Sequence, residues 1–304
     1  MNKTKGFDHQ TTFRSGFVAI LGAPNAGKST LLNRILGQKI SITSKKPQTT
    51  RNRILGICHR EESQLIFLDT PGIHNAKTPF TTRIVEAALA TLSEADLFLL
   101  VADVETPDEP SEKLLLKKLS QQKLPVLLAL NKIDRVERPK LLSLLESWSA
   151  ALSFEAVIPI SAKNGEQVDR LLNAMENVLP EGPPFFPPES LTDLPTRFIV
   201  AERIREKVFR LTGQEIPYAV MVTVDSFTSE KKGALIRIHA TIHVERDSQK
   251  GIVIGKRGTK LKQIGEVARK EIEGLLESKV FLKLFVRVQK NWTKDTRALR
   301  KFGY

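Results

Sequence analysis

Residues 17–30 read FVAILGAPNAGKST, an apolar run that leads directly into a loop with two glycines and a Lys-Ser pair. Apolar residues continue beyond it at helical spacing, so the stretch predicts a strand, a tight loop and a helix in succession. Glycines let the backbone approach an anion closely, and the first N–H groups of a helix attract negative charge. The loop is therefore expected to wrap the phosphates of a nucleotide, and the residues expected to line it are Gly22, Ala23, Pro24, Asn25, Ala26, Gly27, Lys28, Ser29 and Thr30.

Two side chains of this loop carry the expected chemistry. The Lys28 ammonium would neutralise the outer phosphate oxygens, and the Ser29 hydroxyl would ligate Mg²⁺. The alternative is a glycine turn that only connects two core elements. A Lys-Ser pair in this register, with a strand before it and a helix after it, favours the phosphate-binding interpretation.

A second motif addresses the base of the nucleotide. Asn131, Lys132 and Asp134 follow the apolar run 126–130, which predicts another buried strand. An ionised Asp only accepts hydrogen bonds, and guanine offers N1–H and an exocyclic amine side by side, a donor pair that adenine lacks. Leaving a buried carboxylate unpaired is costly, so Asp134 is expected to select guanine. Asn131 is expected to tie this loop to the phosphate-binding loop and the base, and the stem of Lys132 to cover the ring face.

The sequence Ser161-Ala162-Lys163 follows a further short apolar stretch. This tripeptide is expected to place the backbone N–H of Ala162 on guanine O6. On its own it is weak evidence, and its weight comes from the two stronger motifs that precede it in the chain.

The sequence Asp69-Thr70-Pro71-Gly72 comes directly after the apolar run 65–68. An Asp at a strand end that faces the phosphate-binding loop holds Mg²⁺ through water, and the N–H of Gly72 can sense the γ-phosphate. In isolation these residues would be an ordinary turn, but their place between the other two motifs favours the nucleotide role. The stretch 44–51, SKKPQTTR, supplies a hydroxyl that joins Mg²⁺ only while the γ-phosphate is present, which predicts an order–disorder switch.

Residues 17–180 resemble a GTPase domain of the translation-factor-related class, and the GxPNxGKS loop with the QTTR switch resembles its Era-like branch. The resemblance implies that Thr50 is the switch ligand of Mg²⁺ and that Lys28, Thr50 and Gly72 carry the catalytic roles. Ile73 stands where Ras-like proteins have a water-orienting glutamine, and an isoleucine cannot polarise water. Slow hydrolysis that relies on the backbone, the metal and a second cation or partner is therefore expected.

Asn25 is the expected ligand of that second cation. Resemblance to potassium-stimulated relatives implies that its side-chain oxygen ligates K⁺ where other GTPases place an arginine finger. The alternative is that Asn25 acts only as a loop cap, and the residues do not separate the two interpretations.

The length and composition fit a protein of two domains. A chain of 304 residues is long enough to bury two cores. The single Cys58 cannot form an internal disulfide and is expected to be a reduced strand residue. The longest apolar runs, such as 97–102, are too short to span a membrane and predict strands. The first dozen residues contain no apolar signal-peptide core and are expected to be flexible.

A proline-rich stretch at residues 180–188, PEGPPFFPP, marks a domain boundary, because proline density prevents both a helix and an interior strand. Residues 191–304 hold 24 Lys and Arg against 13 Asp and Glu, whereas residues 1–190 hold 23 against 21. Such asymmetry indicates a polyanionic partner, either nucleic acid or an anionic membrane surface. The expected divisions are a flexible N-terminus at 1–14, a GTPase domain at 15–180, a linker at 181–191, a second domain at 192–290 and a basic tail at 291–304.

Residues 252–264, IVIGKRGTKLKQI, favour nucleic acid over a membrane. A Gly-Lys-Arg-Gly turn between two helices lets a sugar-phosphate backbone approach, while Lys256 and Arg257 supply charge. With a helix near 197–211 and strands near 218–228, 234–244 and 280–288, the order resembles a type II KH domain; the alternative is a purely structural turn. The expected RNA-binding residues are Ile254, Gly255, Lys256, Arg257, Gly258, Lys260 and Lys262.

The combination of the two halves resembles the Era-like GTPases over nearly the whole chain. The expected fold is an α/β P-loop GTPase domain with a mostly parallel sheet, followed by an α+β type II KH domain. The resemblance implies GTP or GDP and Mg²⁺ as ligands, and binding of 16S rRNA near its 3′ end during assembly of the small ribosomal subunit. It also implies a cytoplasmic monomer. Peripheral membrane association is reported for the family, but the sequence shows no amphipathic anchor that would make it primary.

Two other functional classes stay open at this point. Ile73 motivates a module that binds nucleotide without useful turnover. The basic second domain motivates a GTPase that uses its charge to sit on an anionic membrane surface.

Four aromatic or imidazole side chains receive a structural interpretation first. His239 and His243 lie on one face of a predicted strand, but no third ligand accompanies them. His74 borders the second switch and is expected to be a solvated loop residue. Trp292 either stacks a base or packs the tail onto the last strand, and the basic helix predicted at 295–302 is expected to be a solvated face.

Overall fold

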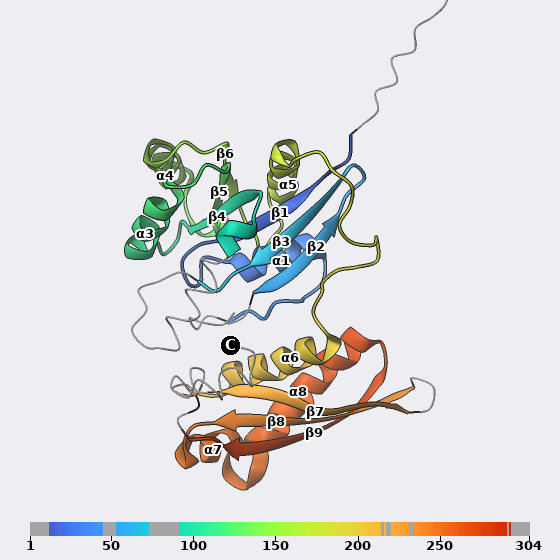
Figure 1. The fold of residues 1–304 in the computed structure, drawn as a ribbon. Coiled ribbons are helices and arrows are strands. Elements are labelled where there is room, and N and C mark those ends of the chain that lie inside the picture. Colours follow the sequence, from blue (N-terminus) through green and yellow to red (C-terminus); the bar gives the residue numbers. More distant parts are fainter. Residues whose placement is uncertain are drawn as a thin grey trace, which may run out of the picture.

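The computed structural model describes residues 12–44, 53–72, 91–213, 216, 220–230, 234–290 and 292. These residues form two units, each built around its own sheet, one of six strands and one of three (Figure 1). Thr50, Ile73, His74 and the basic tail after Trp292 lie outside the described residues.

The first unit is a six-stranded sheet in the order β2-β3-β1-β4-β5-β6. Neighbouring strands are parallel except for the antiparallel pair β2 and β3. Its strands read as continuous apolar runs because helices cover both faces, as is typical of parallel sheets. The strands are β1 (Arg14–Leu21), β2 (Ile54–His59), β3 (Ser63–Asp69), β4 (Leu97–Asp103), β5 (Val126–Asn131) and β6 (Ala156–Ile160).

The helices of this unit form two layers. Helices α1 (Lys28–Leu36) and α5 (Val168–Val178) pack on one face, and α3 (Glu109–Leu119) and α4 (Arg138–Ala151) pack on the other. Two short 3-10 turns, at Thr91–Glu94 and Ile133–Arg135, complete the described part. The mostly parallel α/β sheet expected from the sequence is confirmed.

The functional motifs meet at one edge of this sheet. The phosphate-binding loop follows β1, Asp69 ends β3 and Asn131 ends β5. The strand register places Ile20 beside Asp69 and Asp103 beside Asn131. Because parallel strands present their carboxyl ends at the same edge, three motifs far apart in sequence converge there, as ligand sites do in open α/β sheets.

The second unit has the element order of a type II KH domain. It runs α6 (Thr196–Leu211), β7 (Met221–Glu230), β8 (Leu235–Val244), α7 (Asp247–Ile254), a 3-10 turn (Lys256–Gly258), α8 (Thr259–Leu276) and β9 (Lys279–Val288). Strand β8 pairs antiparallel with β7 and parallel with β9. The inner residues of the sheet pack on all three helices, and Ile264, Ala268 and Ile272 of α8 are fully buried. Figure 1 shows α6 on the side that faces the first unit.

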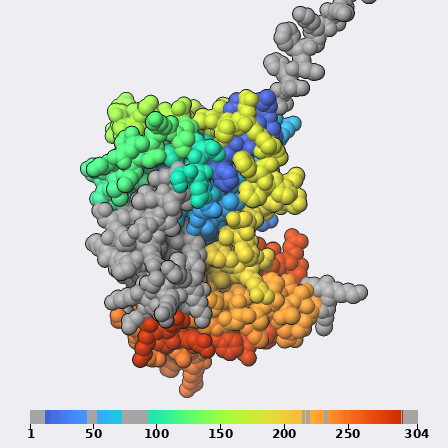
Figure 2. Space-filling view, viewed as in Figure 1, coloured from blue at the N-terminus to red at the C-terminus, as the bar shows by residue number. Residues whose placement is uncertain are grey.

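The segment between the two units is longer than the linker expected at 181–191, and it packs on the first unit. The Gln64 amide bonds the backbone of Phe185 and Phe186, and the Ile57 N–H donates to Leu191 O at 2.9 Å. Thr192 and Leu194 also contact the first unit, and α6 begins only at Thr196. This segment covers the exposed edge of β2 and protects it from pairing with another chain. It is the yellow stretch along the side of the molecule in Figure 2.

The N-terminal boundary also differs from the expectation of a flexible segment through residue 14. Arg14 begins β1 and donates to Leu179 O at 2.6 Å, and the Gly182 N–H donates to Phe13 O at 3.0 Å. These contacts hold residues 13 and 14 in place. None of the helices within the described ranges combines the length and the apolar character needed to cross a bilayer. Cys58 lies on β2, and burial raises the pKa of its thiol to about 11, which keeps it protonated and unreactive.

Candidate functional site

The phosphate-binding loop has the backbone of an anion cradle. Gly27 has a φ of 103°, and a Cβ there would lie 2.1 Å from Asn131 Nδ2, so only glycine fits. The Lys28 ammonium donates to Gly22 O at 3.0 Å and to Ala23 O at 2.9 Å, which points it along the loop. Burial lowers the pKa of Lys28 to about 8, against the opposing effect of the nearby Asp69 carboxylate. An anion at this loop would raise the pKa of Lys28 again by stabilising its charged form.

Ser29 and Asp69 form the corner where a metal is expected. The Ser29 hydroxyl donates to Asp69 Oδ2 at 2.7 Å, and the Ser41 hydroxyl donates to the same oxygen at 2.9 Å. Asp69 Oδ1 is buried and has no hydrogen-bond partner among the described residues. Burial raises the pKa of Asp69, and the Lys28 charge opposes that rise. A buried carboxylate oxygen without a donor, next to a hydroxyl, fits a hard divalent cation such as Mg²⁺.

The base-binding motifs also come together. Asp134 accepts a 2.7 Å hydrogen bond from the Ser161 hydroxyl. Asn131 Nδ2 donates to Ala26 O at 2.8 Å, which ties this loop to the phosphate-binding loop as expected. Lys132 has a left-handed backbone with a φ of 72°, and its ammonium pairs with Asp103. That pair fixes the direction of the lysine stem, and its expected place over the base stays a prediction.

The Ala162 N–H donates to Asn131 Oδ1 at 2.9 Å, which joins the third motif to the second. The physical reason is that Asn131 is buried, and its amide oxygen needs a donor. The expected contact of the Ala162 N–H with guanine O6 stays a prediction. Lys163 contributes its carbonyl oxygen to the Arg34 guanidinium.

The residues after β3 lie against the phosphate-binding loop. The Thr70 hydroxyl donates to Ile20 O at 2.8 Å and so fastens β3 to β1, and Thr70 also lines the pocket formed by the phosphate-binding loop. Gly72 lies so close to Pro24 that a Cβ would come within 2.7 Å of the Pro24 nitrogen. Pro71 between them is buried. Residues 70–72 thus contact the phosphate-binding loop, where the N–H of Gly72 is expected to sense the γ-phosphate.

A cavity of about 790 Å³ opens beside the loop, and both units line it. This volume falls in the range of about 300–1,000 Å³ typical of ligand sites. The lining residues are Asn25, Thr30, Thr43, Ser44, Glu105, Thr106 and Lys132 from the first unit and Phe209 and Arg210 from α6. The participation of α6 was not expected from the sequence.

The Gly-Lys-Arg-Gly turn lies between α7 and α8, as expected. Gly255 and Gly258 have φ values of 72° and 79°, and Arg257 is also left-handed at 51°. Lys256 and Arg257 are exposed at the tip, whereas Ile254 and Lys260 are half-buried beside it and Lys262 is exposed. The Thr259 hydroxyl donates to Lys256 O at 2.9 Å and closes the turn.

The alternative sites weighed in the sequence do not gain support. His239 lies edge-on to Phe285, and His243 contacts the Thr223 hydroxyl at 2.9 Å. No group of three or more His, Cys, Asp or Glu within the described ranges is arranged to hold a metal. Trp292 is fully buried, so its ring is not open to stack on a base.

Comparison with known proteins agrees with this architecture. Residues 17–132 match a family described as a 50S ribosome-binding GTPase, and residues 215–293 match the KH domain family. The chain is 53% identical to GTPase Era of Geotalea uraniireducens over 292 residues, which cover 96% of this chain and 98% of the relative. It is 52% identical to GTPase Era of Geobacter metallireducens over the same shares of both chains. The chain belongs to the Era family of GTPases.

Two solved structures of Era extend the likeness to three dimensions. An Aquifex aeolicus Era variant bound to GDP.AlF4⁻ is 38% identical to this chain and has a TM-score of 0.91. The match covers 96% of this chain and 99% of that chain. Era in complex with MgGDPNP and nucleotides 1506–1542 of 16S ribosomal RNA has a TM-score of 0.90 at the same identity and coverage. The predicted GTPase and KH folds are confirmed, and the chain is a GTPase. A binding module without turnover is thereby set aside.

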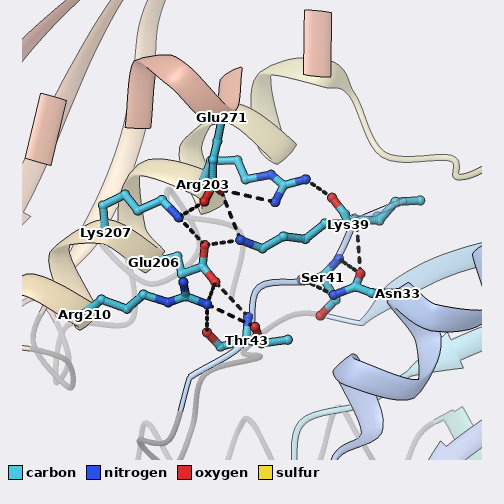
Figure 3. Close-up of polar contacts among 10 residues, drawn as sticks. Asn33, Lys39, Ser41, Thr43, Arg203, Glu206, Lys207, Arg210 and Glu271 are labelled. Carbon is cyan, nitrogen blue, oxygen red and sulfur yellow. Dashed lines mark hydrogen bonds and ion pairs between the residues drawn. The ribbon is translucent and has the colours of Figure 1, made fainter. Parts of the chain in front are cut away.

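One further feature of this Era-family chain was missed by sequence reasoning. A cluster of charged side chains joins the GTPase and KH domains, and Figure 3 shows its contacts. Lys39 pairs with Glu206 of α6 and with Glu271 of α8 at 3.1 Å, and Glu206 also pairs with Lys207 at 2.9 Å. Arg203 donates to Lys39 O. Lys39 lies more than 160 positions from its partners Glu206 and Arg203, so no local pattern indicated these contacts.

Proposed function

We propose that this Era-family GTPase is a GTP-dependent RNA-binding switch that binds 16S rRNA near its 3′ end and assists assembly of the small ribosomal subunit. The observation that carries the proposal is the exposed Lys256-Arg257 tip, held between two glycines of left-handed φ on a KH domain. A turn of this kind clamps about four nucleotides of single-stranded RNA by their backbone. The likeness to Era in complex with a 16S rRNA fragment supports the choice of RNA.

The nucleotide would occupy the P-loop side of the cavity. Lys28 would meet the outer phosphates, Asp134 the guanine donors, and Asn131 would hold the two loops together. Mg²⁺ would be held by Ser29, by Asp69 through water and by Thr50, and the bound metal would neutralise charge on the β- and γ-phosphates. Two observations support this assignment: Asp69 Oδ1 is buried without a donor among the described residues, and the chain resembles Era bound to MgGDPNP.

The protein would act as a monomer in the cytoplasm, where ribosomal subunits are assembled. Its basic domain also supports a second candidate, peripheral contact with an anionic membrane. A competition between anionic liposomes and RNA at matched salt separates RNA binding from membrane binding. At equal concentrations of negative charge, RNA should displace the protein from liposomes, and liposomes should not displace it from RNA. Preferential capture by liposomes would favour the membrane instead.

The test of RNA binding reverses the charge at the tip. Lys256→Asp with Arg257→Asp removes two positive charges next to the phosphate backbone and leaves both glycines intact. The matched control is Arg269→Glu with Lys270→Glu, which makes the same charge change on the exposed face of α8. The probe is a single-stranded RNA with the sequence of the small-subunit 3′ tail, compared with a duplex of equal length.

The tip variant is expected to lose at least about tenfold in affinity and to reduce the salt slope by about 1.4, since each lost phosphate contact on a single strand contributes about 0.7. Basal GTP hydrolysis should stay unchanged, and any stimulation by RNA should disappear. The control variant should retain the parental affinity within about threefold and most of the salt slope. Parental affinity and slope in the tip variant would refute the proposal.

A further inference from the structure

The segment of residues 39–43, here called the bridging segment, is held on its inner side by the GTPase domain. Asn33 Oδ1 accepts from the Ile40 and Ser41 N–H groups, both at 2.9 Å, and Asn33 Nδ2 donates to Ser41 O at 2.7 Å. The Ser41 hydroxyl then donates to Asp69 at 2.9 Å. The bridging segment is therefore in direct contact with the carboxylate assigned to the metal corner.

The KH domain holds the same segment on its outer side. The Thr43 N–H donates to Glu206 at 3.3 Å, and Arg210 donates to Thr43 O at 3.2 Å and to Thr43 Oγ1 at 3.3 Å. At the other end of the segment, Lys39 pairs with Glu206 and Glu271. Figure 3 shows these side chains of α6 and α8 pointing at the segment from one direction. Both backbone groups of Thr43 thus have partners on α6.

Glu206 is the centre of this arrangement. Its side chain is 0% exposed, and it accepts from Lys39, Lys207 and Arg210 as well as from Thr43. Burial alone would raise the pKa of Glu206, but hydrogen bonds and charges from Lys39 and Lys207 outweigh it and hold the pKa below the ordinary value. A buried, fully bonded carboxylate defines one geometry, because each partner lost would leave a charge uncompensated.

Arg210 also lines the cavity beside the phosphate-binding loop. Together with Phe209 it lines this cavity from the KH domain, and Asn25, Thr30 and Thr43 line it from the GTPase domain. The same guanidinium therefore borders the ligand cavity and fixes the residue that leads into the switch stretch 44–51. Helix α6 of the KH domain thus contributes side chains to a cavity beside the proposed nucleotide site.

We propose that Arg210 and Glu206 are positioning residues for GTP hydrolysis, acting from the KH domain. Helix α6 sets the position of Thr43, and the bridging segment passes that position to the Ser41–Asp69 contact. The two residues prepare the metal corner for turnover without themselves holding the guanine. The inference rests on the proposed placement of the nucleotide at the P-loop.

The test compares full-length Arg210→Ala, Arg210→Lys and the parent in single-turnover hydrolysis of GTP with Mg²⁺. The matched control is Arg197→Ala, which removes an arginine of the same helix that donates to Phe227 O within the KH domain. For Arg210→Ala, kcat is expected to fall by about tenfold or more, equivalent to about 1.4 kcal/mol. The KM for GTP and the affinity for GDP should change by less than about twofold.

Two readouts separate positioning from general loss of structure. The Mg²⁺ concentration for half-maximal hydrolysis should rise in Arg210→Ala and not in Arg197→Ala, because only the former loosens the contact to Asp69. Arg210→Lys should recover part of the rate, since an ammonium can still donate to Thr43 O.

A second variant covers the case in which Arg210→Ala does not fold. Thr43→Val removes only the hydroxyl that Arg210 reaches, and it should lower kcat in the same direction by a smaller factor. Its effect should be lost when combined with Arg210→Lys if the two residues act through one contact. Additive effects of the pair would overturn the proposal.

Parental kcat and Mg²⁺ dependence in Arg210→Ala would also overturn it, as would equal losses in Arg210→Ala and Arg197→Ala. Failure of the underlying nucleotide assignment looks different. In that case Lys28→Ala would retain tight GTP binding, whatever Arg210 does. The RNA affinity of Arg210→Ala, measured in parallel, keeps the inference separate from the proposed RNA function.

Discussion

The Ser161 hydroxyl donates a 2.7 Å hydrogen bond to Asp134 Oδ1, which lies 27 positions away, and so joins the two loops that are expected to bind the base. The contact fixes the plane of the carboxylate. It also keeps Asp134 in place beside Arg135, whose guanidinium lies 3.4 Å from the other oxygen. Contacts within the protein thus orient the Asp134 carboxylate without a bound base. A binding site that selects one base needs such preorganised side chains.

Asp134→Asn should change the preferred base. Asparagine keeps an oxygen for Ser161 but replaces one acceptor by a donor, so guanine N1–H and its amine lose a partner. Xanthine, which carries an oxygen in place of that amine, gains one. GTP affinity should fall by about 100-fold or more, and xanthosine triphosphate should become the better ligand.

Competition binding with fluorescent GDP measures this preference. Ser161→Ala is the control, because it removes the orienting bond and keeps the carboxylate; it should weaken GTP by only about fivefold and leave the preference unchanged. An unaltered preference in Asp134→Asn would show that another residue reads the base.

Nucleotide binding should depend on pH through Lys28. Its pKa is lowered to about 8 in the free protein, so the ammonium is charged at pH 7 and largely neutral at pH 9. Phosphates stabilise the charged form, so binding above pH 8 must take up a proton. GDP affinity should be flat from pH 7 to 8 and then fall by up to about tenfold per pH unit.

Calorimetry at pH 8.5 in two buffers of different ionisation enthalpy counts the protons taken up, and about 0.8 per nucleotide is expected from a pKa of about 8. The sign also applies to stability. Between the lowered pKa and the ordinary one the unfolded chain binds a proton that the folded chain does not, so Lys28 makes the free protein more stable as pH rises through that window. Zero proton uptake would contradict the prediction.

Potassium should accelerate hydrolysis through Asn25. This residue lines the cavity and adopts a left-handed φ of 64°, a conformation that asparagine tolerates better than most residues. With Ile73 in place of a glutamine, charge compensation from a monovalent cation is expected to raise turnover. Rates should be several-fold higher in KCl than in NaCl at equal ionic strength.

Two variants separate the ligand role of Asn25 from its role as a loop cap. Asn25→Ala should remove the difference between the salts, whereas Asn25→Asp keeps an oxygen and a tolerance for this backbone, and should preserve it. Equal rates of the parent in both salts would leave Asn25 with the cap role alone.

The motifs of the nucleotide site could be located from the sequence because each is local. The contacts between distant loops could not, because they depend on the folded chain. The phosphate-binding loop and Asp134 follow buried strands, and parallel strands bring their ends together. The bond from the Ala162 amide to Asn131, in contrast, depends on how two loops satisfy each other's buried polar groups. No spacing in the sequence reports that choice.

The charge of the KH domain shows a similar limit. Its excess of basic residues was read as a surface for a polyanion, yet Arg205 and Lys207 are almost fully buried in pairs with Glu202 and Glu206. The net charge of a sequence does not show which basic side chains are paired with acidic ones inside the fold. The turn at Lys256 and Arg257 was predictable because its two glycines are a local signal, and the structure shows both side chains exposed.

The two glycines of that turn should respond differently to substitution by alanine. Gly255 combines a φ of 72° with a ψ of 174°, a region that is essentially restricted to glycine. A Cβ there would also lie 2.6 Å from Lys260 Cβ and 3.0 Å from the Lys260 nitrogen. At Gly258 the φ of 79° with a ψ of 5° is left-handed helical, and a Cβ would meet no atom of the described residues within 4 Å.

Gly255→Ala should therefore lower the free energy of unfolding by about 3 kcal/mol and displace the start of α8, with a matching loss of RNA affinity. Gly258→Ala should cost only about 1 kcal/mol, and Gly258→Asn less than that, because asparagine adopts this backbone readily. Urea unfolding gives the stabilities, and titration with the 3′-tail RNA gives the affinities. Basal GTP hydrolysis is the internal control and should be parental in all three. Equal losses of stability at the two glycines would contradict the prediction. They would mean that the turn relaxes on substitution and so avoids the clash with Lys260.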